Sequence, residues 1–215
     1  MIEIIIFAMI AAFVALRLFS VLGRRPEDDA GPRPLPAEPD QEHYRDAEPV
    51  QDAGVDPLAD MDDGPVRDGL EAIAKADDSF DFGSFKEGAL AAYEMILEGF
   101  WRGERAAYEP YVSKDIAGDF NAALAERERA GHVVENRLID IDQSDVVEAG
   151  VDGKTAEITM SFHANIVAVT KDGDGEVIDG SLSETYQTRD RWTFTRKLGS
   201  RDPNWTVVAT ESEDA

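Results

Sequence analysis

The sequence has 215 residues and is strongly acidic, with 45 Asp and Glu against 21 Lys and Arg and a net charge of −24. Such a charge repels nucleic acid and anionic lipid headgroups at long range, which argues against a nucleic-acid role. The chain contains no Cys, which excludes disulfides, thiolate metal sites and cysteine nucleophiles, and its length suits one ordinary domain plus further segments.

The chain opens with an apolar run that predicts a membrane-spanning helix. Residues Ile4 to Leu22 are apolar except for Arg17 and Ser20. As a helix they would reach roughly 28 Å, close to the thickness of the hydrocarbon core of a bilayer. No basic residue precedes the run and no A-x-A-like site follows it, so a retained anchor over residues 1–25 is favoured over a cleaved signal peptide.

Basic residues beside this run predict its orientation. Arg17, Arg24 and Arg25 lie at or after its end, whereas only Glu3 and the terminal amine precede it. Because Lys and Arg are enriched in cytoplasmic flanks, we expect a single-pass protein whose C-terminal domain is cytoplasmic.

Residues 26–64 are expected to form an acidic, disordered linker. This segment is dominated by Pro, Asp, Glu, Ala and Gly and shows no hydrophobic periodicity. Such a composition cannot offset the entropy of ordering by burying apolar surface. The linker is therefore interpreted as a tether between the anchor and a folded domain.

Three helical segments are predicted next. Val66, Leu70 and Ile73 indicate a short amphipathic helix, and residues 65–79 are taken as this helix and its connection. Ser84 and Glu87 have the spacing of a capping box, which predicts that a second helix begins there. Its apolar stripe is Phe85, Ala89, Tyr93, Ile96, Leu97 and Phe100. A third helix is expected after a Ser113 cap, with the stripe Ile116, Phe120, Ala123 and Leu124.

The remainder of the chain predicts β-structure. Imperfect alternation within residues 133–149 indicates a strand with a bulge, and the clean alternation from Ala156 to Ile166 indicates a half-buried antiparallel strand. A hairpin of residues 191–196 with residues 203–210 is expected to close the sheet. In it, we expect one face to carry Trp192 and Phe194, and the facing strand to present Trp205, Val207 and Ala209. The fold class is therefore α+β, with helices packed on an antiparallel sheet of about four strands.

Candidate catalytic and metal-binding residues are few. Residues 172–176 carry alternating oxygen ligands, but they lack the distal Glu of a calcium loop and are better interpreted as a hairpin turn. His163 is expected on the polar face of its strand, and Asp140 and Asp142 on an exposed edge rather than as an acid/base pair. No G-x-S-x-G, P-loop, H-E-x-x-H or Rossmann motif is present. The case for an enzyme therefore rests only on the possibility of a cavity, and we expect no cofactor or metal.

The order of these features resembles the Tim44-like domain family, above all its alphaproteobacterial membrane-anchored members, over about residues 78–210. The resemblance is carried by Phe80-x-Phe82, Phe85-x3-Ala89-x3-Tyr93-x2-Ile96, Leu138-x2-Ile141, Ala156-x-Ile158-x3-Phe162, Asp190-x-Trp192-x-Phe194-x-Arg196 and Pro203-x-Trp205-x3-Ala209-Thr210. It implies a Tim44-like domain over residues 80–215, with helices on a strongly curved, NTF2-like sheet that encloses an apolar cavity.

The resemblance also implies an adaptor function and no enzymatic activity. The mitochondrial relative is an adaptor at the inner membrane that connects a preprotein translocase to a chaperone motor and contacts cardiolipin, but the region that makes those protein contacts has no counterpart here. We therefore expect an adaptor at the bacterial inner membrane that binds a protein, an acyl chain or an extended peptide, linked to protein translocation or membrane-complex assembly. The alternative is an NTF2-like enzyme or a carrier of small hydrophobic ligands.

Two sets of residues are the candidate binding sites. The expected lining of the apolar pocket is Tyr93, Leu97, Phe100, Phe120, Leu124, Phe162, Tyr186 and Trp192. The expected partner surface is the basic group on the outward face of the last hairpin, namely Arg189, Arg191, Arg196, Lys197 and Arg201. It is the one cluster of basic residues in a segment, residues 80–215, whose net charge is −13.

Overall fold

The computed structural model describes residues 58, 61–200 and 202–212. In this part of the chain, helices come first and strands follow. The helices are α2 (Pro65–Ala76), α3 (Phe82–Arg102), α4 (Arg105–Tyr108), the 3-10 turn η2 (Glu109–Tyr111) and α5 (Lys114–Arg129). The strands are β1 (Val133–Val134), β2 (Arg137–Asp152), β3 (Thr155–Lys171), β4 (Val177–Lys197) and β5 (Thr206–Ser212).

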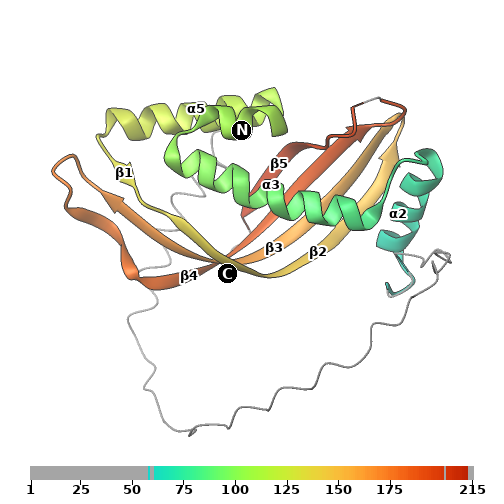
Figure 1. Ribbon diagram of the computed structural model, residues 1–215, viewed down its shortest axis with the longest axis horizontal. Helices are drawn as coiled ribbons and strands as arrows, with labels where there is room; N and C mark the ends of the chain where they lie inside the picture. The colour runs from blue at the N-terminus through green and yellow to red at the C-terminus, as the bar shows by residue number, and fades with distance from the viewer. Residues whose placement is uncertain (1–57, 59–60, 201, 213–215) are drawn as a thin grey trace, which may run out of the picture.

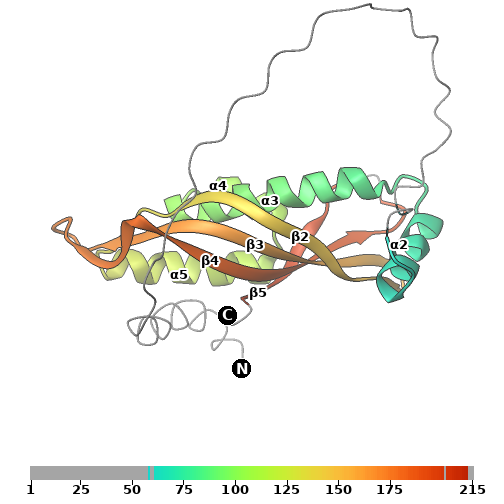
Figure 2. The same ribbon diagram turned by 90° about the horizontal axis from the view of Figure 1, so that it is seen from below.

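The five strands form one antiparallel sheet. β1 and β2 follow each other along one edge of β3, and β4 and then β5 continue the sheet from its other edge. The sheet is long and strongly curved, and the helices α3 and α5 lie on its concave side (Figure 1). Seen from below, the convex face of the sheet is turned toward the viewer and the two helices lie behind it (Figure 2). The predicted α+β fold with helices on a curved antiparallel sheet is confirmed.

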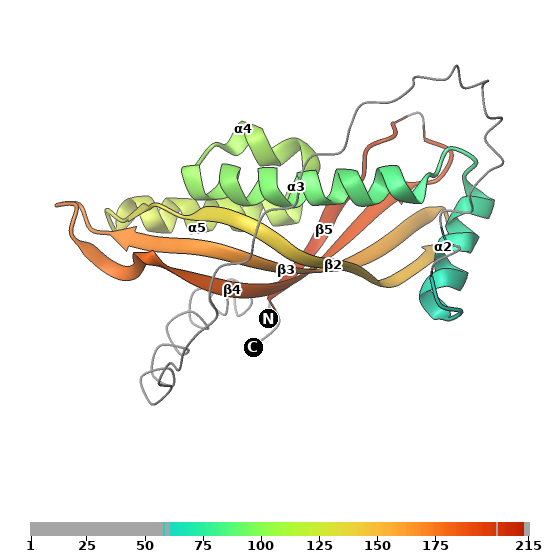
Figure 3. The same cartoon turned by 60° about the horizontal axis from the view of Figure 1, so that its bottom comes forward.

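Helix α2 crosses one end of the sheet and packs against β2 (Figure 3). Its side chains Leu70 and Ile73 are fully buried. Gly69 makes this close approach feasible, because a Cβ at that position would lie 2.0 Å from the carbonyl oxygen of Ala149.

The core between α3 and the sheet is a chain of aromatic rings. The ring of Phe85 contacts those of Trp205 and Phe194, with centroid distances of 4.7 and 5.8 Å. Further along α3, Tyr93 meets Phe162 and Trp192. Rings of this size dominate the apolar area that a domain removes from water, so these contacts fix how α3 lies on the sheet.

Several local predictions are confirmed. The helix over Pro65–Ala76 is present, Ser113 caps α5 by accepting the backbone N–H of Ile116 at 3.2 Å, and β2 contains three register shifts. Among the described residues no helix is long and apolar enough to cross a membrane. The predicted anchor over residues 1–25 and most of the predicted linker, up to residue 57, lie outside the described residues.

Two local predictions are wrong. Helix α3 begins at Phe82, and its N-cap is Asp81, whose carboxylate accepts the backbone N–H of Ser84 at 2.7 Å. Ser84 therefore lies inside the first turn and does not begin a capping box. On β5, a register shift changes the alternation so that Val207 and Thr210 face the core, whereas Ala209 pairs with the outward-facing Thr193.

Candidate functional site

Three residues of the predicted pocket form one tight aromatic cluster. Tyr93 from α3 stacks on Phe162 from β3, with ring centroids 4.3 Å apart and an interplanar angle of 14°. The indole of Trp192 from β4 lies 4.9 Å from the Tyr93 ring. All three side chains are at most 2% exposed, so in this structure they fill the space between α3 and the sheet.

A buried carboxylate completes this cluster. The hydroxyl of Tyr93 donates to Oδ2 of Asp190 at 2.6 Å, and the hydroxyl of Ser212 donates to Oδ1 of the same residue at 2.8 Å. Burial, followed by the nearby charge of Asp190, raises the pKa of Tyr93 far above its usual value, so its proton stays on the phenol. Asp190 thus joins α3, β4 and β5, which are distant in the sequence.

Four further pocket candidates lie in a second group beneath α5. Phe100 and Phe120 contact each other at 4.7 Å, and both contact Tyr108, a buried residue that the sequence analysis had not selected. Leu124 is 1% exposed, and Leu97 is partly buried against the same core. The hydroxyl of Tyr108 donates to Oδ1 of Asn121 at 2.9 Å, which holds α4 against α5.

Tyr186 is the pocket candidate that joins neither group. It lies on β4 opposite Ile166, it is half-buried, and its hydroxyl donates to Glu184 at 3.1 Å. A hollow of about 200 Å³ lies at the other end of the sheet, near α2. None of the eight candidates lines it, since its walls come from residues 148–152 together with Glu157 and Thr159.

Arg196 does not belong to the predicted basic surface. Arg196 does not lie on the outward face, because alternation along β4 places it with Trp192 and Phe194 on the core side. Its guanidinium forms an ion pair with Asp77, with side chains 7% and 13% exposed, and lies 5.2 Å from the centre of the Trp205 ring. The assignment of Arg196 to a partner surface is therefore wrong, and its role is to hold the segment before α3 against the last hairpin.

The surroundings of Asp77 favour its ionised form, which the ion pair with Arg196 requires. A hydrogen bond from the Ser79 hydroxyl, reinforced by the Ser79 backbone N–H and the charge of Arg196, lowers the pKa of the Asp77 carboxyl. The carboxylate therefore stays ionised throughout the physiological range. Sequence spacing alone offers no signal for this pair, because Asp77 and Arg196 are 119 residues apart.

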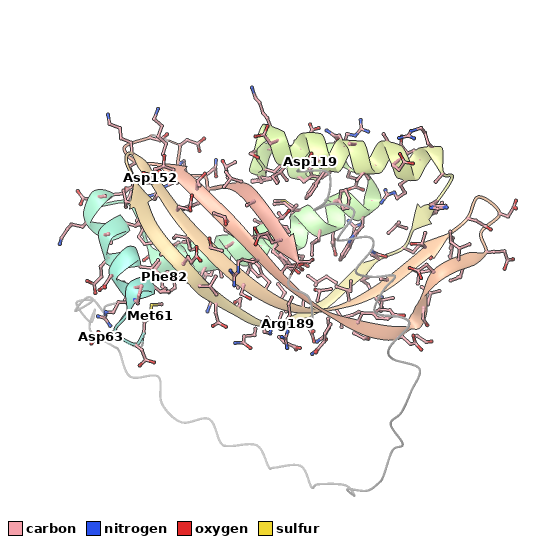
Figure 4. All side chains as sticks on the ribbon, turned by 180° about the vertical axis from the view of Figure 1, so that it is seen from behind. Met61, Asp63, Phe82, Asp119, Asp152 and Arg189 are labelled. Carbon is pink, nitrogen blue, oxygen red and sulfur yellow. The ribbon has the colours of Figure 1, made fainter. Side chains whose placement is uncertain are left out.

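The remaining basic candidates are on or near the convex face. Arg189 is exposed and lies on the underside of the curved sheet, away from the helices (Figure 4). Arg191 is half-buried two residues further along β4, and Lys197 is exposed at the end of the strand. Arg201 lies outside the described residues. His163 pairs with Arg189 across the strands, which confirms its predicted position on the face opposite Met160 and Phe162.

Asp140 and Asp142, which were predicted to lie on an exposed edge, are exposed and bond to Asn165 on β3. The side-chain amide of Asn165 donates to Asp140 at 2.7 Å and to Asp142 at 2.8 Å. In the loop after β3, the carboxylate of Asp172 accepts the backbone N–H groups of Asp174 and Glu176, which is the geometry of the predicted hairpin turn. These acids therefore contribute to local structure, and none of them converges with His163 inside the core.

Comparison with known proteins matches the chain to one family, and its fold resembles several solved structures, two of which are described here. A family model described as Tim44-like domain matches residues 66–212. No curated protein sequence matches the chain. The intermembrane space region of the chloroplast protein ARC6 is 13% identical, with a TM-score of 0.35, over 57% of this chain and 95% of its own. A periplasmic fragment of TraM is also 13% identical, with a TM-score of 0.40, over 60% of this chain and 98% of its own.

Proposed function

The chain belongs to the Tim44-like domain family, and on that premise we propose that it is a membrane-anchored, non-enzymatic adaptor whose folded domain binds a protein partner. Residues 1–25 would hold it in a bacterial inner membrane, as in alphaproteobacterial members, and residues 26–64 would tether the domain. Its place would be in protein translocation or the assembly of a membrane complex. The observation that carries the proposal is the family match, which spans nearly all of the described domain.

The chemistry of the core supports binding rather than catalysis. An enzyme on this scaffold needs at least two titratable side chains that converge in a cavity. Here Tyr93 and Asp190 converge, but they bond to each other in a packed core, and neither lines the hollow near α2. His163 is on the opposite face of the sheet. The proposal therefore places the binding of a protein partner on the surface of the domain.

An acyl chain or an extended peptide is a second ligand for the same domain. The indole N–H of Trp192 is buried and has no acceptor in the described part of the chain. Buried donors are seldom left unpaired, and a ligand carbonyl that entered beside α3 would supply the missing acceptor. This supports keeping the predicted apolar pocket as a proposal, with Trp192 as its polar contact.

Crosslinking in intact membranes tests the adaptor proposal. A photoreactive side chain is placed at exposed Arg189 or Lys197, and at partly buried Phe120 for the interior. Discrete protein adducts from the exposed positions are expected, and mass spectrometry identifies them. Adducts with lipid alone, or no adduct from any position in a stably expressed protein, would overturn the proposal.

The orientation is tested separately. Because Arg17 lies near the end of the predicted span and Arg24 and Arg25 follow it, we propose that the domain is cytoplasmic. Reporters that are active on only one side of the membrane are fused after Ala215. Activity of the cytoplasmic reporter is expected, and activity of the periplasmic reporter alone would place the domain outside the cytoplasm.

A further inference from the structure

Exposed apolar side chains gather at one end of the sheet. Of the seven large apolar side chains that are exposed in the described residues, two lie elsewhere, Tyr111 and Val151, at 36% and 37% exposure. The other five are between 45% and 61% exposed and belong to β1, to the beginning of β2 and to the beginning of β4. We call them the distal apolar patch: Val133, Ile139, Val177, Ile178 and Leu182. This end of the sheet includes the β3–β4 hairpin, whose tip projects past α5 (Figures 1 and 3).

Three of the five patch residues occupy β-bulges. Ile139 is the extra residue at a register shift of β2, and Ile178 is the extra residue at a shift of β4. Leu182 is the first residue of a longer bulge, residues 182–185. The residues on either side of this bulge, Ser181 and Tyr186, pair with Ala168 and Ile166, so residues 182–185 have no partner of their own in β3. Bulges redirect side chains and are frequent beside functional sites. Here the redirected residues are apolar and solvent-exposed, which a purely solubilising surface does not require.

Acidic residues are close to the patch residues along the strands. Asp140 follows Ile139, and Glu176 and Asp179 flank the adjacent Val177 and Ile178. Glu184 lies two residues beyond Leu182. The basic side chains near this end of the strands include Lys171, which is paired with Glu135 at 2.7 Å, and exposed Arg137. The acids outnumber these two bases, and we call Asp140, Glu176, Asp179 and Glu184 the acidic rim of the patch.

We propose that the distal apolar patch binds a segment of a partner protein in which apolar side chains are flanked by Lys or Arg. The apolar residues would cover the patch, and the basic residues would face its acidic rim. A second copy of this chain is a poor occupant, because each copy carries a net charge of −24 and would bring the same acids into contact. The inference rests on the proposed adaptor function and adds the surface and the chemistry of the partner.

The test uses three synthetic peptides of equal length as probes. One alternates Val with Lys, one alternates Ser with Lys, and one alternates Val with Glu. Each is labelled and titrated by fluorescence anisotropy against the full-length chain in an uncharged detergent. Only the Val/Lys peptide is expected to bind tightly, about tenfold or more above the others, and added salt is expected to weaken its binding.

Matched variants locate the binding surface. The double variant Ile178→Ser, Leu182→Ser is expected to weaken binding of the Val/Lys peptide by about tenfold or more. Val151→Ser, an exposed residue at the other end of the sheet, is the control and should have no effect. Glu176→Gln with Glu184→Gln should weaken the same binding and reduce its dependence on salt. Because the substituted side chains are exposed, a urea midpoint within the error of the parent verifies folding of each variant.

Each other outcome overturns the inference. Equal binding by the patch variant and the Val151→Ser control would show that the peptide does not use the patch. Equal binding of the Val/Glu peptide would refute the charge argument. A dimer that the Ile178→Ser, Leu182→Ser variant abolishes, seen by sedimentation, would assign the patch to a second copy. If protein crosslinks from Arg189 persist in any of these cases, the adaptor proposal stands and only its assignment to this patch fails.

Discussion

The substitution Gly69→Ala tests the close contact between α2 and β2. In an exposed helix this substitution stabilises by about 0.5–1 kcal/mol, because Ala restricts the unfolded chain more than Gly does. In α2 the added Cβ would lie 2.0 Å from the carbonyl oxygen of Ala149 and 2.5 Å from its carbonyl carbon. These are backbone atoms, so no side-chain rotation relieves the clash. The helix must move away from β2.

The magnitude follows from what α2 buries. Leu70 and Ile73 are 0% exposed, and full burial of such side chains is worth about 1.5–3 kcal/mol each, so complete undocking would cost about 3–6 kcal/mol. Partial displacement retains some of this burial, and overpacking a core by one methyl group usually costs about 1–3 kcal/mol. After the gain in helix propensity of about 0.5–1 kcal/mol is subtracted, we expect a net loss of about 1–2 kcal/mol.

The assay is urea unfolding of the full-length chain in detergent, followed by tryptophan fluorescence. Gly88→Ala is the matched control, because Gly88 is an exposed position within α3 with nothing inside 4 Å of its added Cβ. The control should be stabilised and Gly69→Ala destabilised. If both variants gained stability to the same extent, the close approach of α2 to Ala149 would be refuted.

Three further substitutions test the polar contacts of the core. Tyr93→Phe keeps the stacked ring but removes one of the hydrogen bonds to buried Asp190, and should lower the free energy of unfolding by about 1–3 kcal/mol in urea titrations; an unchanged value would contradict the hydrogen bond. Arg196→Met should cost about 1–3 kcal/mol at pH 7 by leaving Asp77 unpaired. Because the folded-state pKa of Asp77 is lowered, its contribution is present above its unfolded value and is lost as pH falls through the folded value. The difference between wild type and Arg196→Met should therefore shrink below about pH 4, and a constant difference from pH 7 to pH 3 would exclude the ion pair as its cause. Asp81→Ala should lower the urea midpoint by removing the N-cap of α3, whereas Asp81→Ser should largely restore it; equal loss in both would show that the cap is unimportant.

The positions of the helices and of the central strand were predictable because they depend on local periodicity. The stripe Phe85, Ala89, Tyr93 and Ile96 predicted the buried face of α3, and all four residues are buried. The alternation from Ala156 to Ile166 likewise predicted the buried face of β3. Such patterns are readable without tertiary information, because side chains repeat every 3.6 residues in a helix and every two in a strand.

The candidate sites were less predictable, because they depend on pairing between distant segments. Alternation from Trp192 already places Arg196 on the core side, yet an isolated charge is costly to bury and the residue was assigned to the surface. Only the fold supplies Asp77 and the Trp205 ring as its partners. Ala209 was predicted on the wrong face of β5 for a related reason. A single extra residue in a β-ladder makes the side chains beyond it point to the opposite face of the sheet.

By itself, the sequence determined the fold class, the order of the elements and the aromatic face of the last hairpin, since these follow from patterns within short segments. Only the tertiary structure determined which polar side chains are buried in the core and which apolar side chains are exposed to solvent. Asp190 is buried because Tyr93 and Ser212 are brought to it from α3 and β5. Ile178 and Leu182 are exposed because bulges displace them from the ladder with β3. Both outcomes depend on the register of strands and helices far apart in the chain, which no local pattern encodes.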